Sequence, residues 1–353
     1  MTDADLERRA GAIDRPDETG RTTARESLRR LVGTAGNLGR LEDLAVWLAG
    51  VHRANAPRPL ATVRLVIFAG DHGIAAAGVS TSAPEDTAED LRSILAGGAA
   101  VNVLADLVGA ELHVVDLAVD LDPAGLPEAV TRHKVRRGSG RIDREDALTV
   151  AEAEQAFTAG MAIADAEVDS GADLLIAGDL GVSNTTAAAA LVGVLTRSDA
   201  SLVTGRGNGI DDATWMRKCA AVRDAMRRGR PVLGDQIQLL ATVGGADLAA
   251  LTGFLLQAAA RRTPVLLDGM VAAACALVAQ RIAFRSVDWL LAAQVSPEPA
   301  HRLALHRLSL EPVLDLGLGM GRGSAALLAV PLLRAAAALT EIAAAESVPD
   351  PSP

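Results

Sequence analysis

The sequence has few aromatic residues and few cysteines. Only 2% of its 353 residues are aromatic, Tyr is absent, and the two cysteines are Cys219 and Cys275. Proteins that bind single-stranded nucleic acid stack the bases on aromatic side chains, so this composition argues against that class. The cysteines form no CxxC pair and lie in alanine-rich segments, which indicates small core residues.

The chain also lacks an excess of positive charge, because its formal net charge is −10. Phosphate backbones are held by basic surfaces, so we expect no nucleic-acid partner. The six histidines show no HExxH spacing and no cluster with cysteines, and we predict no metal site. The N-terminus is polar where a secretory signal needs an apolar run, and we expect a cytoplasmic protein without a membrane partner.

Short apolar runs alternate with alanine-rich stretches along the chain. The runs are typical of strands, and most end in glycine; they cover residues 63–70, 111–119, 172–178, 201–205, 263–269 and 311–317. Helical composition is found in residues 184–195, 213–228 and 246–260. Continuous apolar strands separated by helices favour a sheet covered on both faces, so the predicted fold class is α/β, doubly wound, with a mostly parallel sheet in three layers.

Glycine-rich loops follow several of these runs. They read AGDHGIAAAGVS, AGDLGVSNTTAAAAL, TGRGNGIDDATWMRK, DGMVAAA and LGLGMGRGSAA. In open parallel sheets, ligands bind beyond the carboxyl ends of the strands, where such loops lead into helices. The sequence therefore predicts one wide pocket at this edge of the sheet.

The stretch GDLGVSNTTAAAAL, residues 178–191, is the best candidate for binding a phosphate. Gly181 permits positive φ, and Asn184 and Thr185 stand where a helix begins, so the N–H groups of its first turn could hold an anion. Equally, Asn184 and Thr185 could only cap the helix. The stretch is neither a P-loop nor a dinucleotide-binding turn, so nucleotide hydrolysis and hydride transfer lack their usual signatures.

A second flexible turn, TGRGNGIDDATWMRK, is followed by Asp211 and Lys218. Asp211 either caps the next helix or belongs to the pocket. Lys218 is either a solvated lysine or an anion ligand.

Six motifs in order carry a resemblance to a known family. They read FAGDHGIAAAGVS, GDLGVSNTTAAAAL, GRGNGIDDATWMRKCAAV, VGGADLAALTGFLLQAAARRTPVLLDG, SPEPAHRLAL and LEPVLDLG. The chain resembles the nicotinate-nucleotide:dimethylbenzimidazole phosphoribosyltransferases, which make the lower ligand of cobamides. The similarity runs from about residue 38 to about residue 345.

The resemblance implies a homodimer with a large α/β domain and a small helical domain built from the two chain ends. The expected boundaries are 23–62 for the N-terminal helical part, 63–325 for the large nucleotide-binding domain and 326–346 for a C-terminal helix. Composition predicts disorder in residues 1–22 and in the tail 347–353.

The implied reaction moves the phosphoribosyl group of nicotinate mononucleotide to a ring nitrogen of a benzimidazole and releases nicotinate. No cofactor is required. The residues that match the family's phosphate and ribose site are Gly181, Ser183, Asn184, Thr185, Gly205, Gly207, Asp211, Lys218 and Ser296. The expected acceptor pocket contains Asp71, His72, Ser82, Glu89, Asp90 and Met320.

The sequence departs from the family pattern at its expected catalytic position. Family members carry a general-base glutamate between two glycines, and here Arg322 stands between Gly321 and Gly323. A guanidinium stays protonated at physiological pH, so Arg322 cannot accept a proton. Asp179 is a possible substitute. The chain also has Ser183 where the family's phosphate loop has glycine.

Three interpretations remain open at this point. Arg322 could bind an anionic group of an altered acceptor while Asp179, Glu89, Asp90 or the acceptor itself handles the proton. The chain could instead be a catalytically impaired paralogue that binds nucleotide and acts as partner or regulator, as a heterodimer with an intact enzyme. The third interpretation is slow activity on the ordinary substrates. For Arg322 itself, a further possibility is a surface arginine paired with a neighbouring carboxylate.

Overall fold

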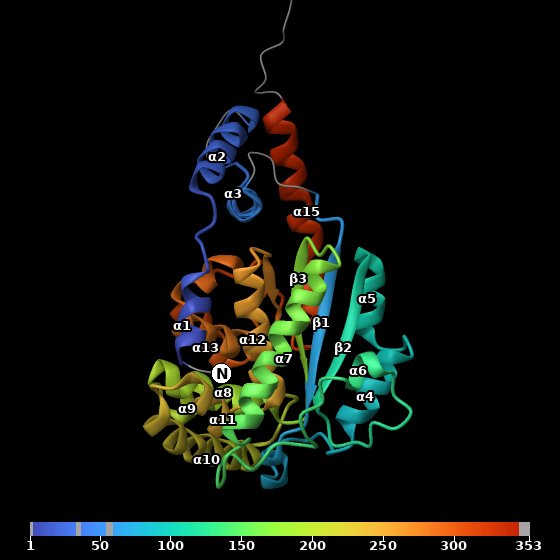
Figure 1. Cartoon of the computed structure of the whole chain (residues 1–353), viewed down its shortest axis with the longest axis vertical. Coiled ribbons are helices and arrows are strands. Elements are labelled where there is room, and N and C mark those ends of the chain that lie inside the picture. The colour runs from blue at the N-terminus through green and yellow to red at the C-terminus, as the bar shows by residue number, and fades with distance from the viewer. Residues whose placement is uncertain (1–2, 33–36, 54–58, 346–353) are drawn as a thin grey trace, which may run out of the picture.

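A parallel sheet lies at the centre of the computed structural model, which describes residues 3–32, 37–53 and 59–345 (Figure 1). The sheet has the order β2-β1-β3-β4-β5, and every strand pair is parallel. The strands are β1 (Val63–Gly70), β2 (Ala110–Ala118), β3 (Leu174–Leu180), β4 (Val265–Leu267) and β5 (Leu290–Ala292). Helices lie on both sides of it, which confirms the predicted α/β class.

The strand order determines where a ligand can bind. The chain reverses its direction of winding between β1 and β3, and the loops that leave these two strands diverge there. Doubly wound sheets bind their ligands at this point, beyond the carboxyl ends of the strands. The register pairs Phe68 of β1 with Asp179 of β3, so Asp179 stands near the carboxyl end of both strands.

Two predicted strands were wrong and one strand was missed. Residues 201–205 overlap the short helix α9 (Ala200–Val203), and residues 311–317 form only an isolated bridge between Leu314 and Gln294. The missed strand is β5, which has three residues. Runs this short carry too little periodicity to separate a strand from a helical turn, so packing decides.

The helices between the strands agree with the sequence pattern. Residues 184–195, 213–228 and 246–260 form α8 (Asn184–Thr196), α10 (Asp212–Gly229) and α12 (Ala246–Ala260). The remaining elements of this part are α4 (Asp86–Leu95), α5 (Ala100–Val108), α6 (Glu128–Thr131), α7 (Val150–Asp169), α11 (Gln236–Val243), α13 (Met270–Ile282), α14 (Pro299–Leu308) and the 3-10 turns Gly73–Ala77, Arg230–Val232 and Phe284–Trp289.

The core is built from the buried strands and from helices that approach one another closely. All eight residues of β1 are buried, and Phe68 meets Phe254 of α12 edge to face at 5.2 Å between ring centres. Helices α7 and α12 touch backbone to backbone, because a Cβ on Gly160 would lie 1.7 Å from the Ala250 carbonyl oxygen. Glycine at this position is therefore required by packing.

Helices from the two ends of the chain pack on one another, away from the ligand-binding edge (Figure 1). They are α2 (Glu18–Val32), α3 (Arg40–His52) and α15 (Ser324–Ala345). Arg334 of α15 donates to the carbonyl oxygens of Leu60 and Val108, which precede β1 and β2. These helices therefore stand where the strands begin.

Part of the N-terminal segment is helical in the structure, whereas the composition of residues 1–22 predicts disorder. It contains α1 (Asp3–Gly11) and the first residues of α2. Ile13 is 1% exposed, and Leu6 and Ala10 pack on the core, so a few apolar side chains hold a segment whose composition is mostly polar. The tail 347–353 lies outside the described residues.

Two helical stretches are long and apolar enough to cross a membrane by length and composition alone, Asp86–Val108 and Ser324–Ala345. The first is divided into α4 and α5 by a turn at Gly97, which has φ 76°. The second is α15, whose residues Leu327, Val330 and Leu333 are fully buried in the core. Both therefore have a place in the folded domain.

Candidate active site

A cavity of about 400 Å³ lies beyond the carboxyl ends of the strands. Its wall combines α4, the loop from β3 into α8, the turn before α10 and the loop that leads into α15. A smaller cavity of about 120 Å³ shares Asp179, Thr185 and Gly207 with it and also contains Ser296. The glycine-rich loops thus surround one connected site, as the sequence predicts.

The N-terminus of α8 is open toward the cavity. Ser183, directly before the helix, has φ 68° and makes no side-chain capping bond, and the Asn184 side chain donates to Asp179 Oδ2 at 2.7 Å instead. The loop lies tightly on β1, because a Cβ on Gly181 would lie 2.0 Å from the Gly70 carbonyl oxygen. In the first turn of α8, the Asn184 N–H donates to the Gly181 carbonyl oxygen at 3.4 Å and the Thr186 N–H donates to the Ser183 carbonyl oxygen at 2.9 Å. The Thr185 N–H between them is the donor that this helix terminus offers to an anion.

Lys218 of α10 places a positive charge beside this helix terminus. Its side chain is buried, and its Nζ donates to Thr185 Oγ1 at 3.4 Å. Burial lowers the pKa of Lys218, and the negative charge of Glu298 opposes that shift. Lys218 lines the cavity, so the interpretation as a solvated surface lysine is excluded.

Asp179 has the most perturbed carboxyl group of the cavity wall. Burial, together with the charge of Asp268, raises its pKa to about 7, although the hydrogen bond from Asn184 and the charge of Arg322 oppose the shift. A carboxyl group with this pKa exchanges protons readily near neutral pH, as general acid–base catalysis requires.

Asp268 holds the loop that carries Arg322. Its carboxylate accepts hydrogen bonds from the backbone of Gly323 at 3.1 Å and of Ala326 at 2.9 Å, and thereby caps α15. Burial raises the pKa of Asp268 to about 6. The loop also touches β3, because a Cβ on Gly178 would lie 2.9 Å from the carbonyl carbon of Arg322.

Arg322 lines the cavity and is paired with a carboxylate of α4. Its Nη2 donates to Asp90 Oδ2, and its backbone has φ 58°, a conformation that few residues other than glycine adopt. The interpretation of Arg322 as an arginine paired with a neighbouring carboxylate thus agrees with the structure. The pair belongs to the wall of the cavity and is only partly exposed.

The other predicted acceptor residues divide into two groups. Ser82, Glu89 and Met320 line the larger cavity. Asp71 and His72 do not line it. His72 is buried with Nε2 at 3.0 Å from Asp247 Oδ2, and Asp71 accepts a hydrogen bond from the backbone of Asp120 at 2.8 Å.

The predicted phosphate and ribose residues also divide. Gly181, Ser183, Asn184, Thr185, Gly207 and Lys218 line the larger cavity, and Ser296 lines the smaller one. Gly205 and Asp211 line neither cavity. Asp211 caps α10 by accepting from the Thr214 backbone at 2.7 Å, and Gly205 leaves room for Glu298, since a Cβ there would lie 2.1 Å from a Glu298 carboxylate oxygen.

Sequence reasoning missed three carboxylates that shape the site. Asp268 lies at the end of a predicted strand and Glu298 lies inside SPEPAH, and the sequence pattern assigns neither of them a role. Glu298 accepts from the Gly207 backbone at 2.8 Å, and Asp247 pairs with His72. Asp268 could have been found from the sequence, because it lies at the end of a predicted strand. Glu298 and Asp247 could not, because their partners Gly207 and His72 are distant in sequence.

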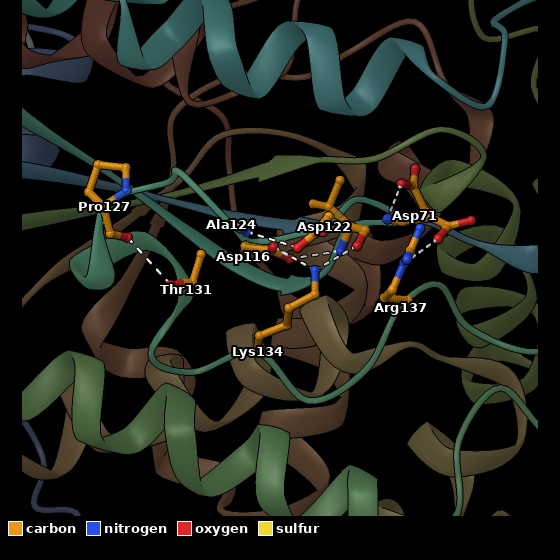
Figure 2. A network of polar contacts seen from close by, with 10 residues as sticks. Asp71, Asp116, Asp122, Ala124, Pro127, Thr131, Lys134 and Arg137 are labelled. Atoms are coloured by element: carbon orange, nitrogen blue, oxygen red, sulfur yellow. Dashed lines mark hydrogen bonds and ion pairs between the residues drawn. The ribbon is translucent and has the colours of Figure 1, made fainter.

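A polar network, buried at Asp116 and exposed at Arg137, holds the long loop after β2 (Figure 2). Lys134 Nζ donates to Asp116 Oδ2 and to the Val119 carbonyl oxygen, both at 2.6 Å, and Arg137 pairs with Asp120 at 2.9 Å. The Asp116 side chain is fully buried, and burial raises its pKa. The network ties this loop to Asp71, which follows the end of β1.

Within residues 3–32, 37–53 and 59–345, no group of three or more His, Cys, Asp or Glu side chains is arranged to hold a metal ion. The cationic groups that line the larger cavity are Arg206, Lys218 and Arg322. Arg206 pairs with Asp212 and Arg322 with Asp90, so among these described groups Lys218 alone makes no ion pair.

Comparisons with known proteins agree with this geometry. The family model described as phosphoribosyltransferase matches residues 13–348. The nicotinate-nucleotide–dimethylbenzimidazole phosphoribosyltransferase of Streptomyces avermitilis is 57% identical over 341 residues, which are 96% of this chain and 91% of that protein. The enzyme of the same name from Mycobacterium tuberculosis is 54% identical over 332 residues, 94% of this chain and 91% of that protein.

Solved structures show the same similarity. The crystal structure of the nicotinate-nucleotide–dimethylbenzimidazole phosphoribosyltransferase from Thermus thermophilus superimposes with a TM-score of 0.86 at 37% sequence identity. The match covers 92% of this chain and 96% of that chain. Sequence and structure therefore agree over nearly the whole length of both proteins.

Proposed function

Because this chain belongs to the phosphoribosyltransferase family, we propose that it transfers the phosphoribosyl group of nicotinate mononucleotide to a ring nitrogen of a benzimidazole-type acceptor. Nicotinate and an α-ribazole phosphate are the products. The observation that carries this proposal is a carboxyl group with a pKa of about 7, Asp179, on the wall of a cavity that also contains an anion-binding helix terminus.

The phosphate of the nucleotide occupies the N-terminus of α8. The backbone N–H and the hydroxyl of Thr185 supply hydrogen bonds, and the Lys218 ammonium supplies positive charge. Ser296 and Gly207, which line the smaller cavity, contact the ribose in this arrangement. Orientation of the nucleotide brings its anomeric carbon into the shared part of the two cavities, where Asp179 is located.

Asp179 takes the proton that the acceptor loses. The acceptor nitrogen forms a bond to the anomeric carbon, the bond to nicotinate breaks, and nicotinate leaves with the electron pair. The proton of the acceptor ring then passes to the Asp179 carboxylate. Since the pKa of Asp179 is about 7, about half of the molecules carry the ionised form at neutral pH.

Arg322 does not take part in the proton transfer, because its guanidinium remains protonated. It lies in the wall next to Asp179, and its positive charge lowers the pKa of Asp179. This keeps more of Asp179 ionised than burial alone would allow. The alternative of an impaired regulatory paralogue is not favoured, since the full-length relatives are named as transferases. Cytoplasmic location and a homodimer remain predictions.

The test is a direct assay of both products. Purified protein is incubated with nicotinate mononucleotide and dimethylbenzimidazole, and nicotinate and α-ribazole phosphate are followed by chromatography with mass detection. We expect equal amounts of the two products. Gly181→Ala serves as the inactive control, because its Cβ would overlap the Gly70 carbonyl and displace the phosphate loop. Binding of the nucleotide without any product would contradict the proposal.

A further inference from the structure

An ion pair joins two distant parts of the chain in the cavity wall. Arg322, in the loop before α15, donates to Asp90 of α4, and both side chains line the cavity together with Asp179. The side chain of Arg322 is 36% exposed and that of Asp90 is 40% exposed, so a molecule in the cavity can reach both.

The backbone holds Arg322 in this position. The following residue, Gly323, donates to the buried carboxylate of Asp268, and the loop rests directly on Gly178 of β3. The loop cannot move away from Asp90 without breaking buried hydrogen bonds. The guanidinium and the Asp90 carboxylate therefore form a built part of the wall.

The surroundings of this pair are acidic. Asp86 and Glu89, on the same helix as Asp90, also line the cavity. These three carboxylates and the single guanidinium of Arg322 carry a formal charge of −2. The positive charge of Arg322 is already compensated by Asp90, so the two remaining carboxylates of α4 repel an anion placed beside this pair. The other cations of the cavity wall, Arg206 and Lys218, belong to the turn before α10 and to α10 itself.

We propose that the Arg322–Asp90 ion pair determines acceptor specificity by admitting uncharged nitrogen heterocycles and rejecting acidic ones. The inference rests on the proposed function, because it concerns the acceptor of that reaction. An acidic acceptor would have to separate Arg322 from Asp90 and then lie beside Asp86 and Glu89. An uncharged ring meets a hydrogen-bond donor and a carboxylate acceptor side by side, with the pair intact.

Two acceptors that differ only in one carboxylate test this inference. Benzimidazole and benzimidazole-5-carboxylate are compared with nicotinate mononucleotide as the co-substrate, and the ratio of their kcat/KM values is the readout. The wild-type protein should prefer benzimidazole by about tenfold or more, since a unit charge at a distance of several ångströms has an effect of this size. A ratio near one would overturn the inference.

Variants of the pair should move the ratio in opposite directions. Asp90→Asn removes a negative charge and releases the guanidinium, so the preference for benzimidazole should fall by about tenfold or more. Arg322→Gln leaves Asp90 unpaired, so the preference should increase. The matched control is Glu85→Gln, a charge change at the exposed start of α4 that lies outside the cavity lining and should leave the ratio unchanged. An identical ratio in Asp90→Asn and the control would overturn the inference.

Binding measurements separate this inference from the proposed function. Calorimetry with the protein loaded with nicotinate mononucleotide gives the affinity of each acceptor without any chemical step. If neither acceptor reacts but benzimidazole binds about tenfold more tightly, the proposed function fails, while the discrimination by the Arg322–Asp90 pair against acidic rings is supported at the level of binding. If both acceptors react but bind equally well, the proposed function stands and the inference fails.

Discussion

Replacing Asp179 by Asn is the sharpest test of the chemistry, because it removes the proton acceptor and changes little else. Asparagine has nearly the same shape, and its side-chain oxygen can still accept the hydrogen bond from Asn184. Loss of a positioned general base lowers the rate by about 10²- to 10⁴-fold. We therefore expect kcat to fall by this factor while the affinity for nicotinate mononucleotide changes by less than about threefold.

The pH dependence of the wild-type protein gives a second, independent measure of the same role. With a pKa of about 7, Asp179 is about one tenth ionised at about pH 6 and about one hundredth ionised at about pH 5. Activity that depends on the ionised form should fall by these factors from its plateau at high pH. An aspartate with an ordinary pKa would remain almost fully ionised over this range.

The assay follows nicotinate release from about pH 5 to about pH 9 under conditions that report kcat/KM for the acceptor, since this parameter reflects the ionisation of the free enzyme. The matched control is Asp211→Asn, an exposed aspartate that lines neither cavity and caps α10, a role that asparagine also fills. Full activity of the Asp179→Asn protein, or an acid limb below about pH 5, would refute Asp179 as the base.

Three further predictions concern the scaffold. Gly160→Ala should destabilise the protein by about 1–3 kcal/mol, because the new Cβ meets the backbone of α12. Gly234→Ala is the control and should not destabilise it, because no heavy atom lies within 4 Å of the Cβ that it adds. Denaturant unfolding compares the two variants. Lys134→Met should lower the free energy of unfolding by about 3 kcal/mol, because it leaves the buried Asp116 carboxylate unpaired. The double variant with Asp116→Asn should regain part of that free energy of unfolding, because it removes the unpaired charge. The hydrogen bond to a glutamate of α7 raises the pKa of His113. The stabilising contribution of His113 is therefore present below about pH 6.5 and is lost as the pH rises through the raised pKa. The difference in unfolding free energy between the wild type and His113→Gln, measured against pH, should shrink above neutrality.

The sequence predicts the class of the fold and the edge of the sheet where the site lies. Apolar runs that end in glycine, such as residues 63–70, require burial on both faces and hence a parallel sheet with helices around it. The same pattern places Asp179 at the carboxyl end of a strand and Asn184 at the start of a helix, where ligands bind in such sheets. Both conclusions depend only on neighbours in the chain.

Short elements lie beyond the reach of sequence pattern. Residues 201–205 look like a strand and fold as part of a helix, while the three residues of β5 give no recognisable signal. In such runs, local preference is smaller than the free energy that tertiary packing contributes. The helix at residues 3–11 follows the same rule, because contacts of Leu6 and Ala10 with the core outweigh its polar composition.

The partners of the charged groups are decided by the tertiary structure alone. The sequence shows that Arg322 stands among glycines, but it cannot show that Asp90, 232 positions earlier, neutralises it. Nor can it show that burial and the charge of Asp268 raise the pKa of Asp179 to about 7. Electrostatic interactions act through space and strengthen as water is removed, so they depend on which distant residues the fold brings together and how deeply it buries them.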